Sequence, residues 1–258
     1  MKTHIATKRA ALPHYEVSVD IVIPVYNEEQ ALGASVDTLV AYLDTYCPYR
    51  WHITIGNNAS TDSTLQVAQK LTLKDPRISL LNLDQKGRGR ALRSAWLSST
   101  ADVVAYMDVD LSTNLQSFLP LIAPLVSGHS DWAVGSRLQR GAIVTRQWKR
   151  EFISRCYNAM IRMVFRNGFS DAQCGFKAIK TTIAHRLIPD VENNEWFFDT
   201  ELLLLAERRR LRIHEVPVDW VEDLDSRVNI VATAIGDIKG LIRLRFRRHQ
   251  RMTPVGGD

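Results

Sequence analysis

The stretch VDIVIPV, residues 19–25, decides the fold class of this 258-residue chain. Its β-branched residues fall on both faces of the segment, which is the pattern of a strand buried between two helical layers. A helical pattern follows at residues 28–46, and a second short apolar strand follows at residues 51–55. Strand, helix and strand in this order predict a βαβ unit and a parallel sheet.

The same unit recurs in the first 110 residues. Ser60 or Thr61 caps a helix that is predicted to run to Lys74. The other elements predicted here are strands at residues 78–83 and 103–107 and a helix at 89–99. After Leu111 the pattern changes, with longer polar connections between its elements. Helices are expected at residues 115–126, 149–165 and 200–209, and strands at 132–135, 175–179 and 211–218.

No linker, repeat or low-complexity tract divides the chain. We therefore predict an α/β fold with a mostly parallel central sheet flanked by helices over residues 17–228. A flexible arm precedes this domain at residues 1–16, and a basic amphipathic helix and tail follow it at residues 229–258.

Composition narrows the class of protein. The chain has 33 Lys and Arg against 28 Asp and Glu, a net charge of +5 that suits an anionic partner without identifying it. Three cysteines, Cys47, Cys156 and Cys174, are far apart and predict reduced thiols in a cytoplasmic protein. The longest apolar stretches fall short of the ~20 residues of a membrane helix, and we expect neither a span nor a signal peptide.

Polar residues follow each of the first four predicted strands, at the edge where open parallel sheets bind ligands. The groups are Pro24, Tyr26, Asn27 and Glu28; then Gly56, Asn57, Asn58, Ser60 and Asp62; then Lys86, Gly87, Arg88, Gly89 and Arg90; and finally Asp108 and Asp110. A proline turn can cross a flat base or ribose, glycines let backbone approach a ligand, and cations meet phosphate oxygens.

Asp108 and Asp110 stand one residue apart at a strand end, where a turn lets both carboxylates reach one hard cation such as Mg²⁺ or Mn²⁺. A metal that bridges two phosphates offsets the charge on a departing diphosphate when a sugar leaves a nucleotide. Such a pair alone also describes solvated or capping aspartates. The position after the fourth strand favours the metal site.

Together these segments resemble the family 2 glycosyltransferases. The matching segments are PVYNE (24–28), NNASTD (57–62), KGRG (86–89) and DVD (108–110). The second half is similar to the polyprenyl- and dolichyl-phosphate sugar synthases, above all the dolichyl-phosphate β-glucosyltransferase type, through GSR (135–137), DAQCGFK (171–177) and WFFDTELL (196–203). The resemblance covers residues 19–230. It implies the GT-A fold, inverting transfer from a nucleoside diphosphate sugar, and a lipid monophosphate acceptor.

The resemblance also implies roles for residues of the donor site. Those expected at the nucleoside are Tyr26, Glu28 and Asn57, with Asp62 supporting their loop. Lys86, Gly87 and Arg88 are expected near the base or phosphates, and Asp108 and Asp110 at the metal and diphosphate. The family usually has Asp where Asn57 stands, and mannosyl-type relatives have Gln where Ser112 stands. An amide suits uracil better than guanine, which offers two neighbouring donors. Both departures favour a UDP-sugar, with glucose as the expected sugar.

On the acceptor side, the resemblance implies that Arg137 meets the acceptor phosphate and that Asp199 lies beneath the acceptor, with Glu201 nearby. A phosphate acceptor is already ionised at neutral pH and needs no general base, so the protein must chiefly hold two anions together. Arg137, Arg146, Arg150 and Arg155 form a cationic series for this task. Arg227 is a further residue that could close over the diphosphate.

Each of these residues has a structural alternative. The helix at residues 149–165 could pack through Phe152, Ile153, Cys156 and Ala159, with its cations in solvent, and Arg227 could cap a turn. Asp199 and Glu201 open a predicted helix and could serve only its dipole. Residues 196–198 could contact a lipid or sugar or belong to the core. Cys174 is expected to be a packed thiol.

The final predicted helix carries an apolar stripe beside dense positive charge. The stripe is Val231, Ile235, Ile238, Ile242 and Phe246; the cations are Lys239, Arg243, Arg245, Arg247, Arg248 and Arg251. Such a helix suits the surface of an anionic membrane and predicts peripheral attachment at its cytoplasmic face. A helix docked on the domain with solvated arginines is the alternative.

We therefore expect a polyprenyl-phosphate sugar synthase that binds a nucleoside diphosphate sugar, and no nucleic acid. Two alternatives remain open at this point. A saccharide or protein hydroxyl as acceptor would make Asp199 or Glu201 a base. A non-enzymatic nucleotide- or nucleic-acid-binding module would account for the basic residues. The oligomeric state is left open.

Overall fold

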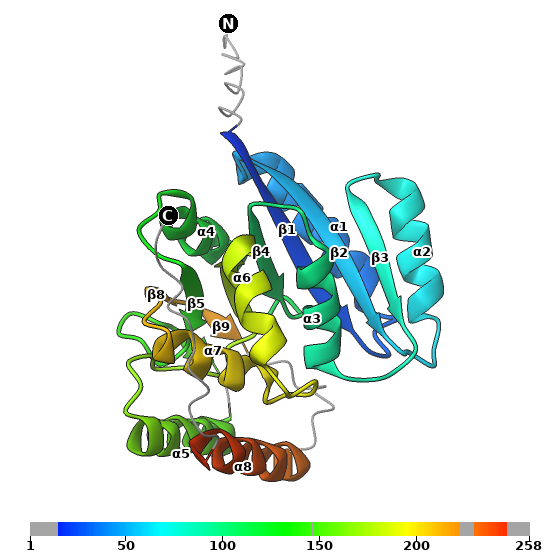
Figure 1. Ribbon diagram of the computed structural model, residues 1–258. Helices are drawn as coiled ribbons and strands as arrows, with labels where there is room; N and C mark the ends of the chain where they lie inside the picture. Colours follow the sequence, from blue (N-terminus) through cyan, green and yellow to red (C-terminus); the bar gives the residue numbers. More distant parts are fainter. Residues whose placement is uncertain (1–14, 146, 222–229, 247–258) are drawn as a thin grey trace, which may run out of the picture.

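The computed structural model describes residues 15–145, 147–221 and 230–246. Its centre is a seven-stranded sheet with the order β3-β2-β1-β4-β7-β5-β8 (Figure 1). The strands are β1 (Tyr15–Val25), β2 (Tyr49–Asn58), β3 (Ile78–Leu83), β4 (Val103–Met107), β5 (Trp132–Ser136), β7 (Phe176–Lys180) and β8 (Ile213–Pro217). Strand β7 runs antiparallel to both of its neighbours, β4 and β5, and the other neighbouring pairs are parallel. The predicted α/β fold with a mostly parallel sheet is confirmed.

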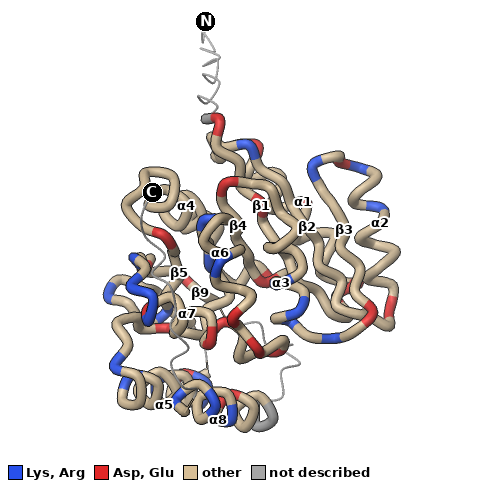
Figure 2. The backbone as a smooth tube through the Cα atoms, in the orientation of Figure 1, with Lys and Arg blue, Asp and Glu red and all other residues tan. Residues whose placement is uncertain are grey.

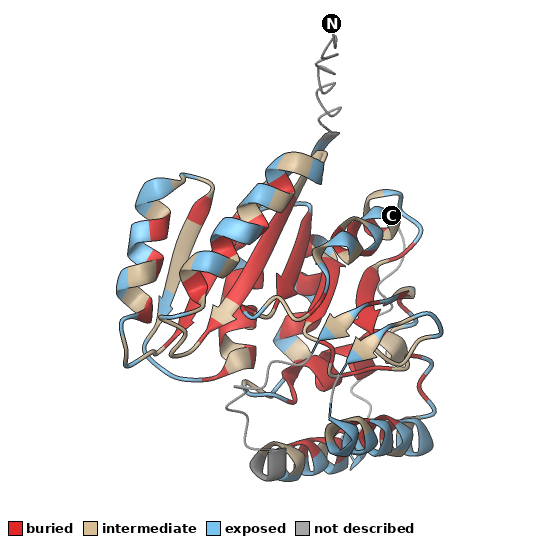
Figure 3. Ribbon diagram, turned by 180° about the vertical axis from the view of Figure 1, so that it is seen from behind, coloured by how far each residue is buried: buried red, intermediate tan, exposed pale blue. Residues whose placement is uncertain are grey.

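Helices cover both faces of the sheet, as the double-sided apolar strands predict. The helices are α1 (Leu32–Tyr46), α2 (Thr64–Lys74), α3 (Arg88–Ser98), α4 (Phe118–Val126), α5 (Trp148–Phe165), α6 (Thr181–Leu187), α7 (Phe198–Arg208) and α8 (Ile230–Phe246). One core lies between the sheet and α1, α2 and α4, and the other lies between the sheet and α3, α6 and α7. Within β1, Ile21 and Ile23 belong to the first core and Val22 to the second. The sheet is correspondingly buried between its layers (Figure 3).

Short elements complete the chain. They are the 3-10 turns η1 (Leu115–Ser117) and η2 (Ile188–Asp190) and the paired strands β6 (Val144–Thr145) and β9 (Trp220–Val221). The helix predicted from Glu28 begins at Leu32, because residues 28–31 form a turn in which Leu32 N–H donates to the Glu28 carbonyl. No helix in the described part of the chain is both long and apolar enough to cross a bilayer.

Helices α5 and α8 lie side by side as a layer at the bottom of the view in Figure 1. The packing considered as an alternative for α5 is wrong. Its buried residues are Ser154, Tyr157, Asn158 and Ile161, whereas Phe152, Ile153, Cys156 and Ala159 are exposed. The reason is a polar anchor: Asn158 Oδ1 accepts the Ala172 N–H at 2.9 Å, so the helix turns its polar face inward.

Helix α8 is docked on the body of the domain, as one of the two alternatives considered for it expects, and its contact with a membrane stays a prediction. It is docked on the body through Leu241, Leu244 and Asp237, which are at most 5% exposed. The apolar stripe lies on the outer face, where Ile235, Ile238, Ile242 and Phe246 are 45–79% exposed. The helix therefore packs with one face and presents apolar side chains to solvent with the other. The predicted arm and tail, at residues 1–14 and 247–258, lie outside the described residues, as does the side chain of Val231.

Candidate active site at the carboxyl edge of the sheet

The loops after β1 and β2 hold each other in place at the carboxyl edge of the sheet. Asn27 adopts a left-handed backbone conformation (φ 58°), donates its N–H to Ser60 Oγ at 3.0 Å, and accepts the Thr61 N–H at 2.8 Å. Asp62 accepts the Thr64 N–H and hydroxyl at 3.0 and 2.6 Å, which begins α2. These contacts make Asn27, Ser60 and Asp62 residues that position the loop.

Residues expected at the nucleoside lie around the ends of β1, β2 and β3. Asn57 is 1% exposed; its side-chain nitrogen donates to Asn82 Oδ1 at 2.7 Å, and its own oxygen has no hydrogen-bond partner in the described residues. The Lys86 ammonium lies 3.6 Å from the centre of the Tyr26 ring. Pro24 pairs with Gly56 in the sheet, and Glu28 N–H donates to Thr64 Oγ1 at 2.7 Å. The edge thus offers an aromatic ring, a cation and an unpaired amide oxygen.

The glycines that follow β3 lie where α3 packs closely against the chain around the start of α7. Gly87 has a φ of 152°, and its N–H donates to Asn58 Oδ1 at 2.7 Å. A Cβ at Gly87 would lie 2.6 Å from the Asn194 carbonyl oxygen, and one at Gly89 would lie 2.5 Å from Phe198 Cβ. These glycines let α3 approach Asn194 and Phe198 closely, and the expectation that they also let backbone approach a ligand stays a prediction.

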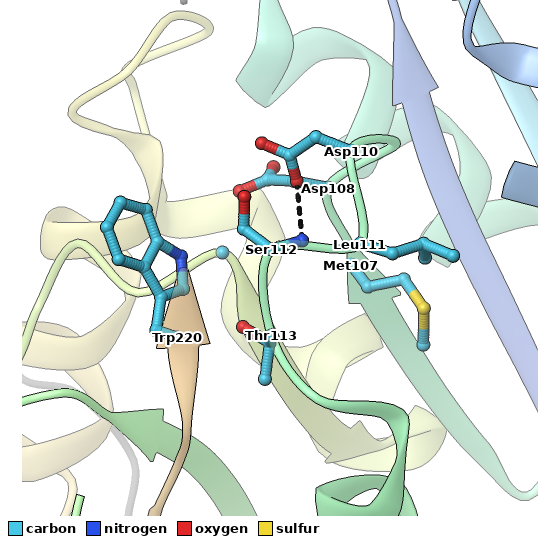
Figure 4. Close-up of a pocket in the computed structure, with 8 residues that line it drawn as sticks. Met107, Asp108, Asp110, Leu111, Ser112, Thr113 and Trp220 are labelled. Atoms are coloured by element: carbon cyan, nitrogen blue, oxygen red, sulfur yellow. Dashed lines mark hydrogen bonds between the residues drawn. The ribbon is translucent and has the colours of Figure 1, made fainter. Parts of the chain in front are cut away.

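Asp108 and Asp110 follow β4 and lie on the same side of the turn, opposite Trp220 (Figure 4). The Ser112 N–H donates to Asp110 Oδ1 at 2.9 Å, and Asp110 is exposed to solvent. A small cavity of about 10 Å³ adjoins them. It is lined by Met107, Asp108, Asp110, Leu111, Ser112, Thr113, Gly175 and Trp220. Its volume suits one water-sized species.

The chemistry of this turn fits a hard divalent cation. Asp108 lies against Gly175, where a Cβ would come within 1.8 Å of Asp108 Oδ2, so only glycine leaves room for the carboxylate. In the described residues, no group of three or more His, Cys, Asp or Glu side chains could hold a metal. Two carboxylates with the remaining positions supplied by phosphates and water match the usual binding of Mg²⁺.

Arg88 links this turn to a buried acidic residue. Its Nη2 donates to Asp108 Oδ1 at 2.5 Å, and its Nη1 donates to Asp199 Oδ2 at 3.2 Å. Burial acts against the charge of Arg88, but the groups around it, chiefly Asp108 and then Tyr106 and Asp199, together outweigh burial and raise the pKa of the guanidinium. Arg88 is therefore a permanent cation between two carboxylates.

Asp199 is 4% exposed and surrounded by donors. The Tyr106 hydroxyl donates to Asp199 Oδ2 at 2.7 Å, and the fully buried Lys177 ammonium lies 3.5 Å from Asp199 Oδ1. Burial raises the pKa of Tyr106 well above its ordinary value, so this phenol keeps its proton. A carboxylate enclosed in this way is poorly placed to take a proton from a substrate hydroxyl.

Glu201, two residues after Asp199, joins α7 to α8 and to the segment that precedes α7. Its side chain is fully buried, and Glu201 Oε2 accepts from Arg243 Nη2 of α8 at 2.6 Å and from the Asn193 N–H at 2.9 Å. Both Asp199 and Glu201 lie in the first turn of α7, where negative charge suits the helix dipole. The contacts with α8 and with Asn193 make Glu201 a structural residue in this arrangement.

The cations predicted for the acceptor occupy different surroundings. Arg137 makes a two-point ion pair with the buried Asp171, from Nε at 2.8 Å and from Nη2 at 3.0 Å. Burial alone would raise the pKa of Asp171, but the charge and hydrogen bonds of Arg137, with the charge of Lys177, together outweigh burial and lower the pKa to about 2. Arg150 lies partly buried in the first turn of α5. Arg146 and Arg227 lie outside the described residues.

An open pocket of about 430 Å³ joins Arg137 to the exposed surface of α5. Its lining consists of Arg137, Leu138, Gln139, Ala142, Val144, Trp148, Glu151 and Arg155. Trp148 is 74% exposed. The lining therefore combines the Arg137 guanidinium and the exposed Trp148 ring with the Glu151–Arg155 ion pair of α5.

Several residues of the site carry no signal that could have been used in the sequence. Trp220 reaches the Asp108 turn because it forms a β-bridge with Thr113, and Asn82 reaches Asn57 because the two residues are register partners in the neighbouring strands β3 and β2. Gly175 and Lys177 belong to the segment 171–177, which is part of the family resemblance but for which the resemblance implies no role of either residue.

The three aromatic residues before and at the start of α7 differ in burial. Phe197 and Phe198 are core residues at 1% exposure, whereas Trp196 is 42% exposed with its ring 4.9 Å from the Arg88 guanidinium. Burial raises the pKa of Cys174 to about 12, which confirms a packed thiol.

Comparisons with known proteins agree with this geometry. The family model for glycosyl transferase family 2 matches residues 20–188. Glycosyltransferase AglD of Haloferax volcanii is 34% identical over 249 residues, which are 93% of this chain but only 40% of that protein. A dolichyl-phosphate beta-glucosyltransferase of Trichomonas vaginalis, ALG5C, is 31% identical over 83% of this chain and 67% of its own length. The Drosophila melanogaster dolichyl-phosphate beta-glucosyltransferase is 30% identical over 81% and 68%.

Among solved structures, the fold is similar to glucosyl-3-phosphoglycerate synthase of Mycobacterium tuberculosis in complex with Mn²⁺, UDP and glucosyl-3-phosphoglycerate. The TM-score is 0.64 and the identity is 14%, over 89% of this chain and 80% of that one. The same enzyme with Mg²⁺ and UDP gives a TM-score of 0.61 at 16% identity, over 88% and 78%. At these identities the likeness supports the GT-A fold alone.

Proposed function

Because the chain belongs to glycosyl transferase family 2 and is a glycosyltransferase, we propose that it transfers glucose from UDP-glucose to a polyprenyl monophosphate at a membrane surface. The transfer is inverting and requires Mg²⁺ or Mn²⁺. Membership of an enzyme family sets aside the non-enzymatic nucleic-acid-binding interpretation. The acceptor, the donor and the metal each have separate support.

The open pocket between Arg137 and Trp148 is the observation that carries the proposed acceptor. A polyprenyl phosphate has a dianionic head and an apolar chain, and the pocket is lined by the cations Arg137 and Arg155 and by the exposed ring of Trp148, with one carboxylate, Glu151, beside them. The ion pair with Asp171 engages Nε and Nη2 of Arg137 and leaves Nη1 outside it. The relatives named as dolichyl-phosphate glucosyltransferases support the same class of acceptor.

The proposed donor nucleotide is UDP because of Asn57 and Asn82. Asn57 presents a buried oxygen without a partner, which can accept the imide hydrogen of uracil. The side chain of Asn82 meets Asn57 at the exposed edge of the sheet and can supply a second contact. Guanine would need a carboxylate for its two neighbouring donors. We expect Asn57→Asp to reduce the preference for UDP over GDP, measured as the ratio of their dissociation constants.

Asp108 and Asp110 are the residues that would hold the metal. When bound there, a divalent cation supplies positive charge to the diphosphate as it leaves. Arg88 already lies on Asp108, and it can contribute its own charge to the same diphosphate.

The reaction forms a bond between an acceptor phosphate oxygen and the anomeric carbon, and breaks the bond from that carbon to the donor diphosphate. No proton has to be removed from an ionised phosphate. The enclosure of Asp199 by Arg88, Tyr106 and Lys177 accords with this, since the site then needs electrostatic support and not a base. The role of Arg137 is to hold the attacking oxygen near the sugar against the repulsion of the diphosphate.

The outer faces of α5 and α8 are proposed to meet the membrane. The exposed apolar side chains are Trp148, Phe152, Ile153 and Met163 on α5, and Ile235, Ile238, Ile242 and Phe246 on α8. Basic residues lie along both helices (Figure 2), among them exposed Lys149, Arg162, Lys239 and Arg245. Apolar side chains flanked by cations suit an anionic lipid surface and predict peripheral attachment at the cytoplasmic face.

Transfer of labelled glucose from UDP-glucose to a polyprenyl phosphate in anionic vesicles tests the proposal. Product that partitions into organic solvent, and that requires Mn²⁺ or Mg²⁺, is expected. Product that stays in water with a saccharide acceptor would instead favour a hydroxyl acceptor. For the membrane, Ile242→Ser should weaken vesicle flotation, whereas Leu73→Ser, an equally simple change of an exposed leucine on α2, should not.

A further inference from the structure

The inner face of α8 makes close contact with the residues that begin α7. Gly240 lies against the Phe197 ring so closely that a Cβ there would come within 2.3 Å of the ring. Arg243 donates to the buried Glu201 at 2.6 Å and also lies 3.3 Å from Glu192. Contact this close fixes the position of one helix relative to the other.

We propose that α8 positions the active site, with Gly240 and Arg243 acting on Asp199 and, through Asp199, on Arg88. The proposal rests on the proposed function for its activity readout. It assigns a second role to a helix whose outer face was considered above only as a membrane contact.

Two chains of contacts lead from α8 toward the metal turn, the turn after β4 that holds Asp108 and Asp110: one reaches Asp108 through Arg88, and the other reaches α3, the helix that carries Arg88. Phe197 immediately precedes α7, and Asp199 in its first turn accepts from Arg88, which in turn donates to Asp108. The second chain runs through Glu201, which accepts the Asn193 N–H next to Asn194, whose carbonyl accepts the Arg90 N–H of α3.

Asp237 of α8 makes a third contact, with Gln173 in the segment that precedes β7. Asp237 lies 3.4 Å from the side-chain nitrogen of Gln173, and it accepts a hydrogen bond from Tyr157. Gln173 is two residues from Gly175, against which Asp108 rests. A shift of α8 would therefore reach Asp108 through Gly175 as well as through Arg88. Because the packed residues have little free space, such a shift is passed on to the site.

Two glycines of α8 provide a matched test. Gly240→Ala places a methyl group in the Phe197 ring, whereas Gly236→Ala meets nothing within 4 Å. Both changes gain the same helix propensity, and both leave the outer apolar stripe intact. The measurements are vesicle flotation, hydrogen exchange of residues 86–91 and 192–201, and transfer kinetics in vesicles.

Gly240→Ala is expected to speed exchange in both segments and to lower kcat about tenfold to a hundredfold at unchanged flotation, since small misplacements cost this much. Gly236→Ala should match the unaltered protein. Adding Phe197→Leu to Gly240→Ala makes room for the methyl group and should restore kcat, which separates displacement from unfolding.

Two outcomes would overturn the proposal: unchanged kcat and exchange in Gly240→Ala, or a kcat loss that Phe197→Leu does not reverse in a folded protein. The proposed function fails in a different way, since the unaltered protein would then make no lipid-linked sugar. The exchange comparison needs no substrate and still decides whether α8 holds these segments.

Discussion

Two acidic pairs share the same spacing but not the same surroundings. Asp108 and Asp110 end a strand, and the Asp108 side chain is 44% exposed. Asp199 and Glu201 begin a helix, and their side chains are 6% and 0% exposed. Arg88 touches one member of each pair.

The difference teaches that burial and existing partners, and not spacing, decide what a carboxylate can do. An exposed pair with few partners can accept a metal ion and its phosphates. A buried pair already neutralised by Arg88, Lys177 and Arg243 contributes to the fold and to positioning. Four variants test this contrast, in order of decreasing expected effect.

The largest effect is expected at the exposed pair. Asp110→Asn should lower transfer by about 10²–10³-fold, because removing one group that stabilises the leaving diphosphate costs about this much. Its free energy of unfolding without ligand should stay within about 0.5 kcal/mol of the unaltered protein. Kinetics over a range of Mn²⁺ concentrations, with urea unfolding, provide the measurement. Transfer that survives in Asp110→Asn would refute the metal role.

At the buried pair the expected loss is in stability. Glu201→Ala removes the partner of Arg243, and breaking a buried pair costs about 3–5 kcal/mol. Arg243 is 36% exposed and partly rehydrates, so about 2 kcal/mol is expected. Urea unfolding measures the change. If Glu201→Ala proved as stable as Asp110→Asn, the contrast between the two pairs would be lost.

A third acidic residue, Asp237, links the contrast to pH. Its pKa is raised to about 6, chiefly by burial, with Tyr157, Gln173 and Asp199 as its neighbours. A raised carboxyl pKa means that the folded protein binds more protons than the unfolded chain between about pH 6 and 4, so this group adds stability as pH falls. From pH 7 to 5 the gain is about 1 kcal/mol.

Asp237→Asn should remove that gain and leave a flatter dependence of stability on pH. The comparison is between the urea midpoints of variant and unaltered protein at pH 7 and pH 5. The effect of Asp171 on stability has the opposite sign. Its pKa is lowered to about 2, so its contribution to stability is present at neutral pH and is lost only at more acidic pH. Identical pH dependence in the two proteins would contradict a buried, raised carboxyl.

The smallest effect is expected at a solvent-exposed pair. Asp37→Asn removes the partner of Lys74, and both side chains are more than half exposed. Stability should change by less than about 0.5 kcal/mol, and transfer should not change. The variant is also the control for Asp110→Asn, because it removes a carboxylate far from the metal turn.

The first half of the chain could be predicted from sequence because each of its strands is marked by the residues of the strand itself. Residues 19–25 and 103–107 are apolar on both faces, and the polar groups after them meet at one edge by the geometry of parallel strands. Asp108, Asp110 and Asn57 were found in this way. The neighbour of Asn57, Asn82, was missed because its partner is set by strand order.

In the second half of the chain, the burial of key side chains depends on contacts between residues far apart in the sequence, which no local pattern contains. Asn158 faces inward from α5 because it accepts a hydrogen bond from Ala172. Asp199 is buried because Tyr106 and Lys177, from two other strands, lie against it. Short strands such as β7 give no sign of their direction. Gly175 reaches Asp108 because β7 pairs with β4, and Trp220 reaches the same turn through its bridge with Thr113.

The place of β7 has a consequence for how the protein is made. It lies between β4 and β5, which both precede it in the chain. Those two strands therefore lack their common neighbour until β7 has been synthesised. Until residue 180 leaves the ribosome, β4 has one open edge, and open edges recruit other strands. The turn that holds Asp108 and Asp110 after β4 therefore gains its neighbour Gly175 only once the chain has been made as far as β7.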